Sequence, residues 1–515
     1  MILTSPLYRK QSALYNTAIR NILFKEEYRY EKTLLLVLLS LIAAGTASCA
    51  ENETLPAADN AAETAAPVTE AVTEEARIPS SLPETDLNGF VFTMFQAETF
   101  FHEKGLYAEA ENGDIVNDAV FRRNRGIMEK YNCVLEEQMT DDYYCMDKLT
   151  PAILAGDDTV DLIFECGDRA TVNAPYFLDF TDLPYLDFTK PWWNEEFNQS
   201  VMLNGHLYFT MGAHMISAKS SLIGVVVNKD TAKNYDIDVQ ELYGAARDGV
   251  WTLDRLGSLA KLASVDINGD GVMDEKDQWG ILGENYMNWS LALGSGFRCV
   301  THDADGSFVY SFGCEKNTAI MDKVMRYTTD KNLTLFAQQM QTSDHYQTLR
   351  EMTANGQYLF NLTWLVNDMR AFTYDYGFLP IPKYDEQQKR YYSDGSLGNN
   401  RLMVIPKTTS DPDTAAFLIE AIAYASYYEL LPVYYQDFLN TKVLRDEESV
   451  EMLRIIQDAL YYDCGALYNW GEMRWTIEGL AAASSNTLAS TAAAKEKEVL
   501  SAIEATLAAL DESST

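Results

Sequence analysis

The sequence predicts an α/β fold of two lobes, closed by a helical C-terminal third. Apolar runs of strand length alternate with segments of helical periodicity along the middle of the chain, a pattern that favours βαβ units and parallel sheets. From Thr414 onward the spacing of apolar residues is helical. Two lobes are expected because the chain after residue 86 is longer than the roughly 250–300 residues at which a single core stops growing.

The elements of the first predicted lobe follow one another as strand, helix, strand, helix and strand. The first strand comes directly after the turn sequence Asn88-Gly89. The second helix should end at Gly156, because glycine readily adopts the left-handed conformation that closes a helix. The five elements are strand 90–95, helix 118–131, strand 134–137, helix 146–155 and strand 160–164.

The last third is expected to contain three main helices. Segments 414–425 and 449–459 carry apolar residues at helical spacing, so each should bury one face. Segment 488–510 is rich in Ala, Glu and Leu, which are strong helix formers.

The charge of the chain limits the class of its partners. Asp and Glu number 76 against 40 Lys and Arg, which gives a formal net charge of -36. A chain this acidic repels phosphate backbones, so no nucleic-acid partner is expected.

Aromatic side chains are abundant, with 31 Tyr, 22 Phe and 8 Trp. A flat ring can stack on the apolar face of a sugar while polar side chains bind its hydroxyl groups. The pair Trp192-Trp193 and the later tryptophans are candidates for this role. The alternative for each ring is packing in a core.

Residues 1–48 have the order of a secretory signal. Lys25, Arg29 and Lys32 precede an apolar run at 34–44, and small residues follow. The run is shorter than the about 20 residues that a transmembrane helix needs. The sequence therefore predicts export from the cytoplasm.

The end of this signal resembles the lipobox of bacterial lipoproteins. Thr46-Ala47-Ser48 directly precede Cys49, and the resemblance implies that the Cys49 thiol is acylated and becomes the new N-terminus. Thr46 departs from the Leu that is usual at its position. The alternative is ordinary signal cleavage beside an incidental cysteine.

Residues 49–86 are expected to form the acylated Cys and a disordered spacer. From residue 50 to about 85 the chain consists largely of Ala, Thr, Glu and Pro and has no aromatic residue, so it cannot bury apolar area. Lipid anchor and spacer together predict an extracytoplasmic protein held at the cell membrane.

The sharpest local motif is the loop 266–277, whose oxygen-bearing residues have the spacing of a calcium loop. Gly271 permits the sharp turn, and Asp277 replaces the Glu that is usual at the last position. The loop is expected to hold a structural calcium ion; the alternative is a polar turn without an ion. The candidate metal ligands are Asp266, Asn268, Asp270, the carbonyl of Val272, Asp274 and Asp277.

Catalytic motifs are absent from the sequence. It has no Gly-x-Ser-x-Gly, no His-Glu-x-x-His, no P-loop and no Gly-x-Gly-x-x-Gly after a strand. The six cysteines other than Cys49 include no Cys-x-x-Cys pair, so zinc and redox motifs are unsupported, while disulfides such as Cys299 with Cys314 stay open. We therefore expect no enzyme, although the many carboxylates are compatible with a glycosidase pair.

Five segments in order along the chain resemble extracellular solute-binding proteins of carbohydrate-type ABC importers. They include a Gly-x-Leu-Pro-x-Pro-Lys strand and turn and an Asp-Pro-Asp before an apolar helix. The segments are 117–125, 155–162, 183–194, 376–384 and 411–416.

This resemblance implies a type II periplasmic-binding-protein-like fold, in which crossing strands join two lobes around a ligand cleft. The predicted crossings lie near 219–222, 372–377 and 402–405. The predicted lobes are then 87–220 with 376–404, and 221–375 with 405–515.

The resemblance and the position of residues after strands together suggest four ligand contacts. Asp168 follows the strand that ends at Phe164, and Trp364 follows a second apolar run. Asp168 would bind vicinal hydroxyl groups and Trp364 would stack on a sugar ring. Trp289 and Arg401 are further candidates.

The predicted function is that of a lipid-anchored receptor, expected to be a monomer, that captures a sugar or oligosaccharide by cleft closure and delivers it to an ABC permease. One alternative is a secreted glycoside-active enzyme. Another is the same receptor fold with a peptide or polyamine as its ligand.

Overall fold

In the computed structural model the chain is divided into two units, Met1–Glu75 and Ala76–Thr515. Only the second unit is described below, and the predicted signal, Cys49 and most of the spacer lie outside it. The described residues are 77–99, 102–303, 306–364, 369, 372–395, 400–440 and 445–513.

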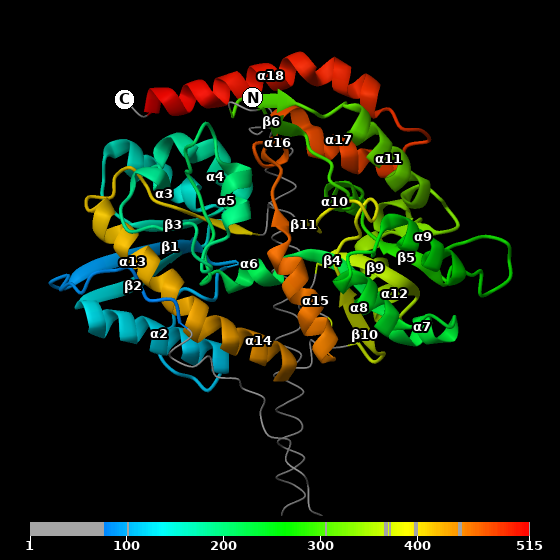
Figure 1. The fold of residues 1–515 in the computed structure, drawn as a ribbon, viewed down its shortest axis with the longest axis horizontal. Coiled ribbons are helices and arrows are strands. Elements are labelled where there is room, and N and C mark those ends of the chain that lie inside the picture. Colours follow the sequence, from blue (N-terminus) through cyan, green and yellow to red (C-terminus); the bar gives the residue numbers. More distant parts are fainter. Residues whose placement is uncertain are drawn as a thin grey trace, which may run out of the picture. The chain divides into compact units, whose positions relative to one another are not determined.

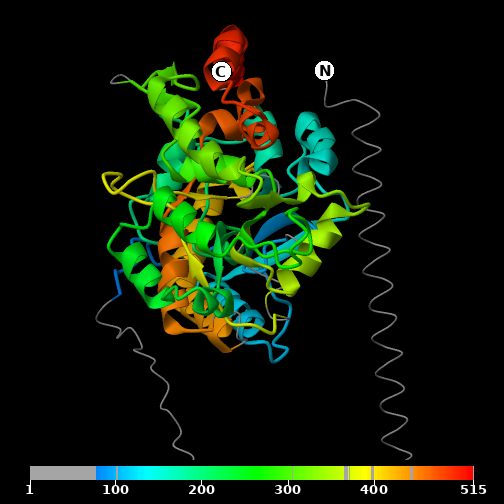
Figure 2. The same cartoon turned by 90° about the vertical axis from the view of Figure 1, so that its right-hand side faces the viewer.

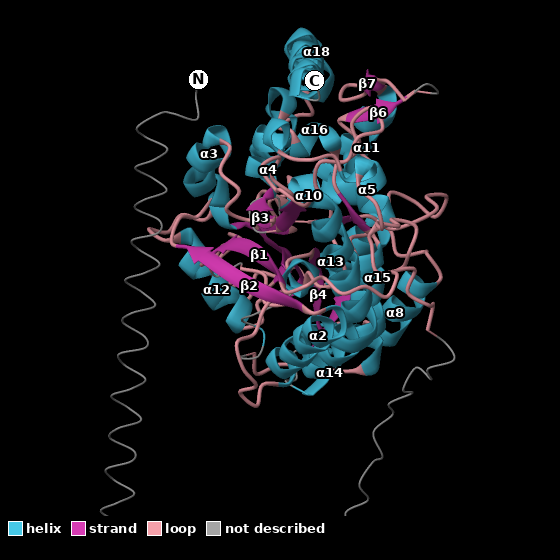
Figure 3. Cartoon of the chain, turned by 90° about the vertical axis from the view of Figure 1, so that its left-hand side faces the viewer, coloured by secondary structure: helices cyan, strands magenta, loops and turns pink. Residues whose placement is uncertain are grey.

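A four-stranded sheet forms the centre of the first lobe (Figures 1 and 3). Its strand order is β12-β3-β1-β2; β1 is parallel to β2 and β3, and β12 is antiparallel to β3. The strands are β1 (Phe90–Ala97), β2 (Cys133–Thr140), β3 (Leu162–Cys166) and β12 (Arg401–Val404). The three predicted strands of this lobe are therefore confirmed.

Helices α2 (Ile115–Tyr131) and α3 (Cys145–Ala155) connect these parallel strands. Asp114 caps α2, because its side chain accepts hydrogen bonds from the N–H groups of the first turn. Gly156 ends α3 in the left-handed conformation, as the sequence predicted. In Figure 3 the strands lie between α3 on one side and α2 on the other.

A five-stranded sheet forms the centre of the second lobe. Its order is β10-β4-β9-β5-β8; β5 is parallel to β8 and β9, and β4 is antiparallel to β9 and β10. The strands are β4 (Ile223–Asn228), β5 (Trp279–Gly283), β8 (Thr334–Phe336), β9 (Tyr358–Trp364) and β10 (Tyr376–Leu379). The main helices are α7 (Lys229–Asn234), α8 (Val239–Arg247), α9 (Leu253–Leu262), α10 (Met287–Gly294), α11 (Glu315–Thr328) and α12 (His345–Ala354).

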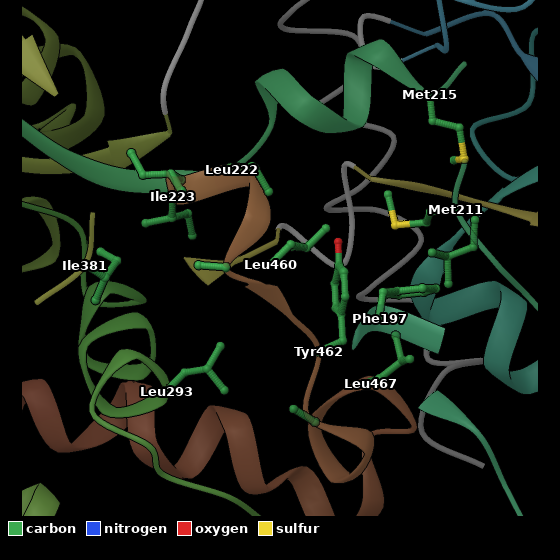
Figure 4. Packing of buried hydrophobic residues seen from close by; sticks show 14 of the residues in the cluster. Phe197, Met211, Met215, Leu222, Ile223, Leu293, Ile381, Leu460, Tyr462 and Leu467 are labelled. Atoms are coloured by element: carbon green, nitrogen blue, oxygen red, sulfur yellow. The ribbon is translucent and has the colours of Figure 1, made fainter. Parts of the chain in front are cut away.

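Three segments connect the lobes. Helix α6 (Ile216–Ser220) leads from the first lobe into β4, and β11 (Ser393–Asp394) leads back toward β12. Strand β13 (Leu460–Tyr461) pairs in parallel with β11, and Leu222 pairs with Gly395. The crossing segments therefore lie side by side, as Figure 4 shows for Leu222 and Leu460.

The structure differs from the predicted lobe boundaries at two places. Strand β10 pairs with β4 in the second sheet, so the segment 376–404 does not belong to the first lobe as a whole. The return to the first lobe occurs after β11, not near 372–377. An apolar strand carries no mark of its partner, because pairing depends on tertiary context.

The segment 405–515 is also shared between the lobes. Helices α13 (Pro412–Ala425) and α14 (Leu431–Asn440) pack on α2 of the first lobe. Helix α15 (Glu447–Asp458) packs on α8 and β10 of the second. The remaining helices are α16 (Cys464–Leu467), α17 (Met473–Gly479) and α18 (Leu488–Ser513).

A π-helical turn, Ser426–Leu430, joins α13 to α14. Arg123 of α2 is buried here and donates hydrogen bonds to Ser426 Oγ and to the carbonyls of Gly105 and Leu106. Burial lowers the pKa of Arg123 to about 9. The buried guanidinium charge of Arg123 is thus stabilised by carbonyl and hydroxyl oxygens. Within the described residues no carboxylate contacts it directly.

Apolar packing between the sheets is continuous around the crossing segments. Leu222, Ile223, Leu460 and Tyr462 are buried there, together with Phe197 of α5 (Glu195–Val201) (Figure 4). The six described cysteines are all free thiols, so Cys299 and Cys314 form no bridge. No described helix has the length and apolarity that crossing a membrane requires.

Candidate ligand-binding site at the strand ends

Asp168 lies in α4 (Gly167–Asn173), directly after β3. Its side chain is exposed, yet desolvation by the surrounding protein raises its pKa, against the opposing effects of Arg169 and Tyr144. The Tyr144 hydroxyl donates to Asp168 Oδ2 at 3.4 Å. A carboxyl that is both exposed and partly desolvated has protein on several sides, as a ligand-contacting group requires.

Two tyrosines follow β2 at the same edge of the first sheet. The half-buried rings of Tyr143 and Tyr144 meet edge to face, with centroids 4.9 Å apart. The Arg169 guanidinium lies 4.4 Å from the Tyr144 ring centroid. The sequence analysis did not single out these residues, although two consecutive aromatic residues soon after a strand were a usable signal.

Arg401 is buried beneath this edge, with 2% of its surface exposed. It donates to Thr99 Oγ1 at 2.9 Å and to Cys166 Sγ, and its guanidinium lies 5.3 Å from the Tyr143 ring centroid. The predicted ligand contact is therefore placed under Tyr143, where it supports the ring from below.

The carboxyl ends of three parallel strands form the corresponding edge of the second sheet. Trp364 ends β9, Glu284 follows β5, and Gln338 follows β8. The Trp364 ring is half-buried and lies 5.8 Å from the ring of Tyr286, at an interplanar angle of 36°. Asp168 and Trp364 thus lie at strand ends, as the sequence predicted, and Glu284 and Tyr286, which were not predicted, follow β5 at the same edge as Trp364.

Glu284 is half-buried, and desolvation raises its pKa to about 7. Gln338 makes a side-chain hydrogen bond to it and also accepts one from Asn285 N at 2.9 Å. The carboxyl group is therefore fixed beside the Tyr286–Trp364 ring pair and can hold a proton near neutral pH.

Trp289 is not part of this exposed edge. Helix α10 buries it almost completely, with its ring 6.1 Å from Phe297 and the Arg474 guanidinium 6.0 Å from its centroid. The prediction of a ligand contact is not supported, because all eight residues of α10 are buried and the helix lies inside the lobe.

A buried polar cluster joins β11 to α10 and α17. Asp394 of β11 accepts from Ser290 Oγ at 2.9 Å and lies 3.8 Å from Arg474 Nη2. Arg474 also contacts Glu478 at 2.8 Å. Burial raises the pKa values of both Asp394 and Glu478. This cluster links a crossing segment to helices of the second lobe.

Three buried polar atoms on the segment 393–401 have no hydrogen-bond partner among the described residues. They are Ser393 Oγ, Asn400 Oδ1 and Arg401 Nε. Buried polar atoms are nearly always satisfied, so such atoms indicate bound water or a polar ligand.

The tryptophan pair has a structural role. Trp192 and Trp193 are buried, and their indole N–H groups donate to the two oxygens of Glu420 at 2.8 and 2.9 Å. Of the eight tryptophans only Trp475, on α17, is largely exposed, at 61%. Most of the tryptophan rings therefore pack in a core, which was the alternative to a sugar-stacking role.

The loop 266–277 is closed by hydrogen bonds between its carboxylates and its own backbone. Asp266 accepts from Gly269 N and Gly271 N, at 2.7 and 2.8 Å. Asp277 is buried and accepts from Ile267 N and Asp274 N. Within the described residues no three His, Cys, Asp or Glu side chains are grouped as a metal site. The oxygen donors nevertheless suit a hard cation such as Ca²⁺.

No protein-family model and no curated protein matches the sequence. Solved structures do match. The maltose-binding periplasmic protein MalE from Listeria monocytogenes, in complex with maltose, has a TM-score of 0.53 at 14% identity, covering 82% of this chain and 98% of that one. A cyclo/maltodextrin-binding protein complexed with maltotetraose has a TM-score of 0.51 at 14% identity, with 82% and 96% covered.

UspC from M. tuberculosis is similar to the same extent, with a TM-score of 0.50 at 13% identity, covering 82% of this chain and all of that one. The likeness extends over nearly the whole length of each of these proteins. The chain therefore has the two-lobe α/β fold of the type II periplasmic binding proteins, which confirms the predicted fold class.

Proposed function

We propose that the protein is a lipid-anchored, extracytoplasmic substrate-binding protein that captures a sugar or oligosaccharide for an ABC importer. The observation that carries this proposal is that polar and aromatic side chains stand at the carboxyl ends of strands in both sheets. Asp168 and Tyr144 stand at the carboxyl ends of parallel strands in one sheet, and Glu284 and Trp364 stand at those of parallel strands in the other. Ligands of open α/β sheets bind outside the carboxyl ends of the strands.

The chemistry of these side chains suits a sugar. An indole ring such as that of Trp364 offers a flat apolar surface to the face of a pyranose. Carboxyl groups such as those of Asp168 and Glu284 bind hydroxyl groups through short, directional hydrogen bonds. Two of the similar structures contain maltose and maltotetraose, which supports a sugar as the ligand here.

Binding would proceed by closure of the two lobes around the ligand. The crossing segments at Leu222, Asp394 and Leu460 lie together and can serve as one hinge. Closure excludes water and strengthens each polar contact to the ligand. The unpartnered atoms of Asn400 and Arg401 lie on the same segment, where a polar ligand or water would satisfy them.

We also propose that the loop 266–277 binds a structural calcium ion. Its side chains offer only oxygen ligands, and Gly269 and Gly271 have φ angles of 73° and 82° that the tight loop requires. The ion would replace the backbone N–H groups as the partner of Asp266 and the other carboxylates. It would stabilise the second lobe and take no part in sugar binding.

A thermal-shift and calorimetry screen of the purified protein against monosaccharides, maltose and maltotetraose tests the sugar proposal. A sugar at 100 times its dissociation constant should stabilise the fold by about 2.7 kcal/mol. A response to peptides or polyamines and to no sugar would refute it and favour another ligand on the same fold. Steady release of shortened oligosaccharides would show a glycoside-active enzyme instead.

A further inference from the structure

Helix α18 begins on the second lobe. Asn486 precedes it and donates to Asp322 Oδ1 of α11 at 2.8 Å. In its first turns the carbonyl of Ala492 accepts from the Tyr310 hydroxyl of β7 (Phe308–Tyr310) at 2.8 Å. Gly313 lies so close to Ala492 that a Cβ atom there would be 2.4 Å from the Ala492 methyl. The start of the helix is therefore fixed to α11 and β7.

The middle of α18 passes over the turn 469–472, which connects α16 to α17. Lys495 Nζ donates to the Gly471 carbonyl at 2.7 Å, and Trp470 Nε1 donates to Thr506 Oγ1 at 3.0 Å. Val499 is completely buried and leaves no room for a side chain at Gly471. Three residues spread over about three turns of α18 thus hold this turn.

The turn 469–472 joins the lobes and has a strained backbone. Helix α16 packs on α4 and α5 of the first lobe, and α17 packs on α10 of the second. Asn469, Gly471 and Glu472 have φ angles of 52°, 60° and 54°. A left-handed residue that is neither Gly nor Asn, such as Glu472, persists only where the surrounding structure enforces it. The contacts with α18 provide that enforcement.

The end of α18 reaches the first lobe. Its residues contact the 3-10 turn Ala174–Tyr176, which directly follows α4 and lies six to eight residues after Asp168. Ile503 and Leu510, in the last turns, are 5% and 4% exposed. Figures 1 and 2 show α18 running along one side of the molecule, from α11 and α17 toward the side of α3.

We propose that α18 is an interlobe strap that holds the lobes in the arrangement of this structure and opposes their opening. Its first half is fixed to the second lobe, and its last turns hold Ala174–Tyr176 of the first lobe beside the helix that carries Asp168. Opening of the cleft then requires these last turns to separate from the first lobe, which exposes Leu510 and Ile503 to water. The inference rests on the lobe movement assumed in the proposed function, but it needs no ligand.

Distances between spin labels in the purified full-length protein test this strap. One label is placed on α2 through Glu129→Cys and the other on α9 through Lys261→Cys, with the exposed thiol removed by Cys314→Ser. All three side chains are exposed. The perturbing variant is Leu510→Asp. The matched control is Leu500→Asp, because Leu500 lies on the same helix with 39% of its surface exposed.

Without any sugar, Leu510→Asp is expected to raise the ratio of long to short distances about tenfold, since a tenfold change needs only about 1.4 kcal/mol. Leu500→Asp should leave the distribution unchanged. Identical distributions in the two variants would overturn the strap. If Leu510→Asp fails to fold, Leu510→Ala replaces it, with Leu500→Ala as its control. Amide hydrogen exchange within residues 174–176 is then the second measurement. Its rate must rise in Leu510→Ala and not in Leu500→Ala.

Titration with maltotetraose separates the strap from the proposed function. If the wild type binds the sugar, the strap predicts weaker binding by Leu510→Asp, and equal affinities would count against it. If the wild type binds no sugar, the proposed function fails, and the label distances still decide whether α18 holds the lobes together.

Discussion

Trp364 ends β9 with its ring half-buried and 5.8 Å from the ring of Tyr286, at the edge where we propose that the sugar binds. We predict that Trp364→Ala weakens binding of maltotetraose about tenfold, because the lost stacking contributes roughly 1.4 kcal/mol. Trp364→Phe should retain most of the affinity. Calorimetric titration measures both, and equal affinity of wild type and Trp364→Ala would remove Trp364 from the site.

The raised pKa of Glu284 predicts that the free energy of unfolding depends on pH. Its pKa of about 7 lies above its ordinary value of 4.5, so between these pH values the folded state binds more protons than the unfolded state. The free energy of unfolding should therefore fall as pH rises from 4.5 to 7. We expect Glu284→Gln to remove this contribution.

Chemical denaturation of wild type and Glu284→Gln at pH 5 and pH 8 checks this effect. Glu386→Gln, at an exposed position of the second lobe, serves as the control. The buried His214 acts in the opposite direction up to pH 6.5, because burial lowers its pKa to about 3. It contributes equally to all three proteins, so the difference between them isolates Glu284. A parallel pH response of Glu284→Gln and wild type would contradict the assignment.

Burial separates the site residues that the sequence could predict from those it could not. The strand-end positions of Asp168 and Trp364 were predictable because a residue after an apolar strand lies at a sheet edge whatever its neighbours are; their contact with a ligand stays a prediction. Trp289 and Arg401 are polar or aromatic residues near such positions too, yet both are buried. Their burial depends on packing by α10 and Tyr143, and those contacts are set by distant parts of the chain. No local pattern reveals them.

The calcium loop is an element whose ion binding is directly testable. We predict that Ca²⁺ raises the melting temperature of the wild type, with about 2.7 kcal/mol of stabilisation at 100 times the dissociation constant. Asp270→Ala should abolish the rise, because it removes a central ligand. The control Asp230→Ala changes an exposed Asp of α7 outside the loop and should retain the rise. The absence of a rise in the wild type would leave the loop as a polar turn.

Most elements were predictable because their signals are local. The strands at 90–95 and 160–164 have largely apolar runs of strand length, and Gly156 ends its helix through its own backbone freedom. Strand β10 shows the limit. It was predicted as a strand, but its partner is β4, whose sequence lies about 150 residues earlier. Pairing of this kind is decided by three-dimensional neighbours.

At the scale of the whole molecule, the proposed attachment to the membrane depends on one thiol. We predict that Cys49→Ser abolishes incorporation of a radiolabelled fatty acid and releases the protein from the membrane fraction, because acylation supplies the anchor. Cys314→Ser, at an exposed cysteine of the described body, should leave labelling and fractionation unchanged. Continued labelling of Cys49→Ser would refute the lipoprotein interpretation.

Strand β12 also determines when the protein can fold. It completes the first sheet by pairing with β3, although its residues follow those of β3 by more than 230 positions. Closing so large a loop is entropically costly, and contacts between distant segments slow folding. An emerging chain therefore cannot finish its N-terminal lobe until residue 404 has left the ribosome. For the proposed exported protein, this delay would help keep the polypeptide unfolded while a secretion channel threads it across the membrane, so the topology that brings the crossing segments together would also suit export.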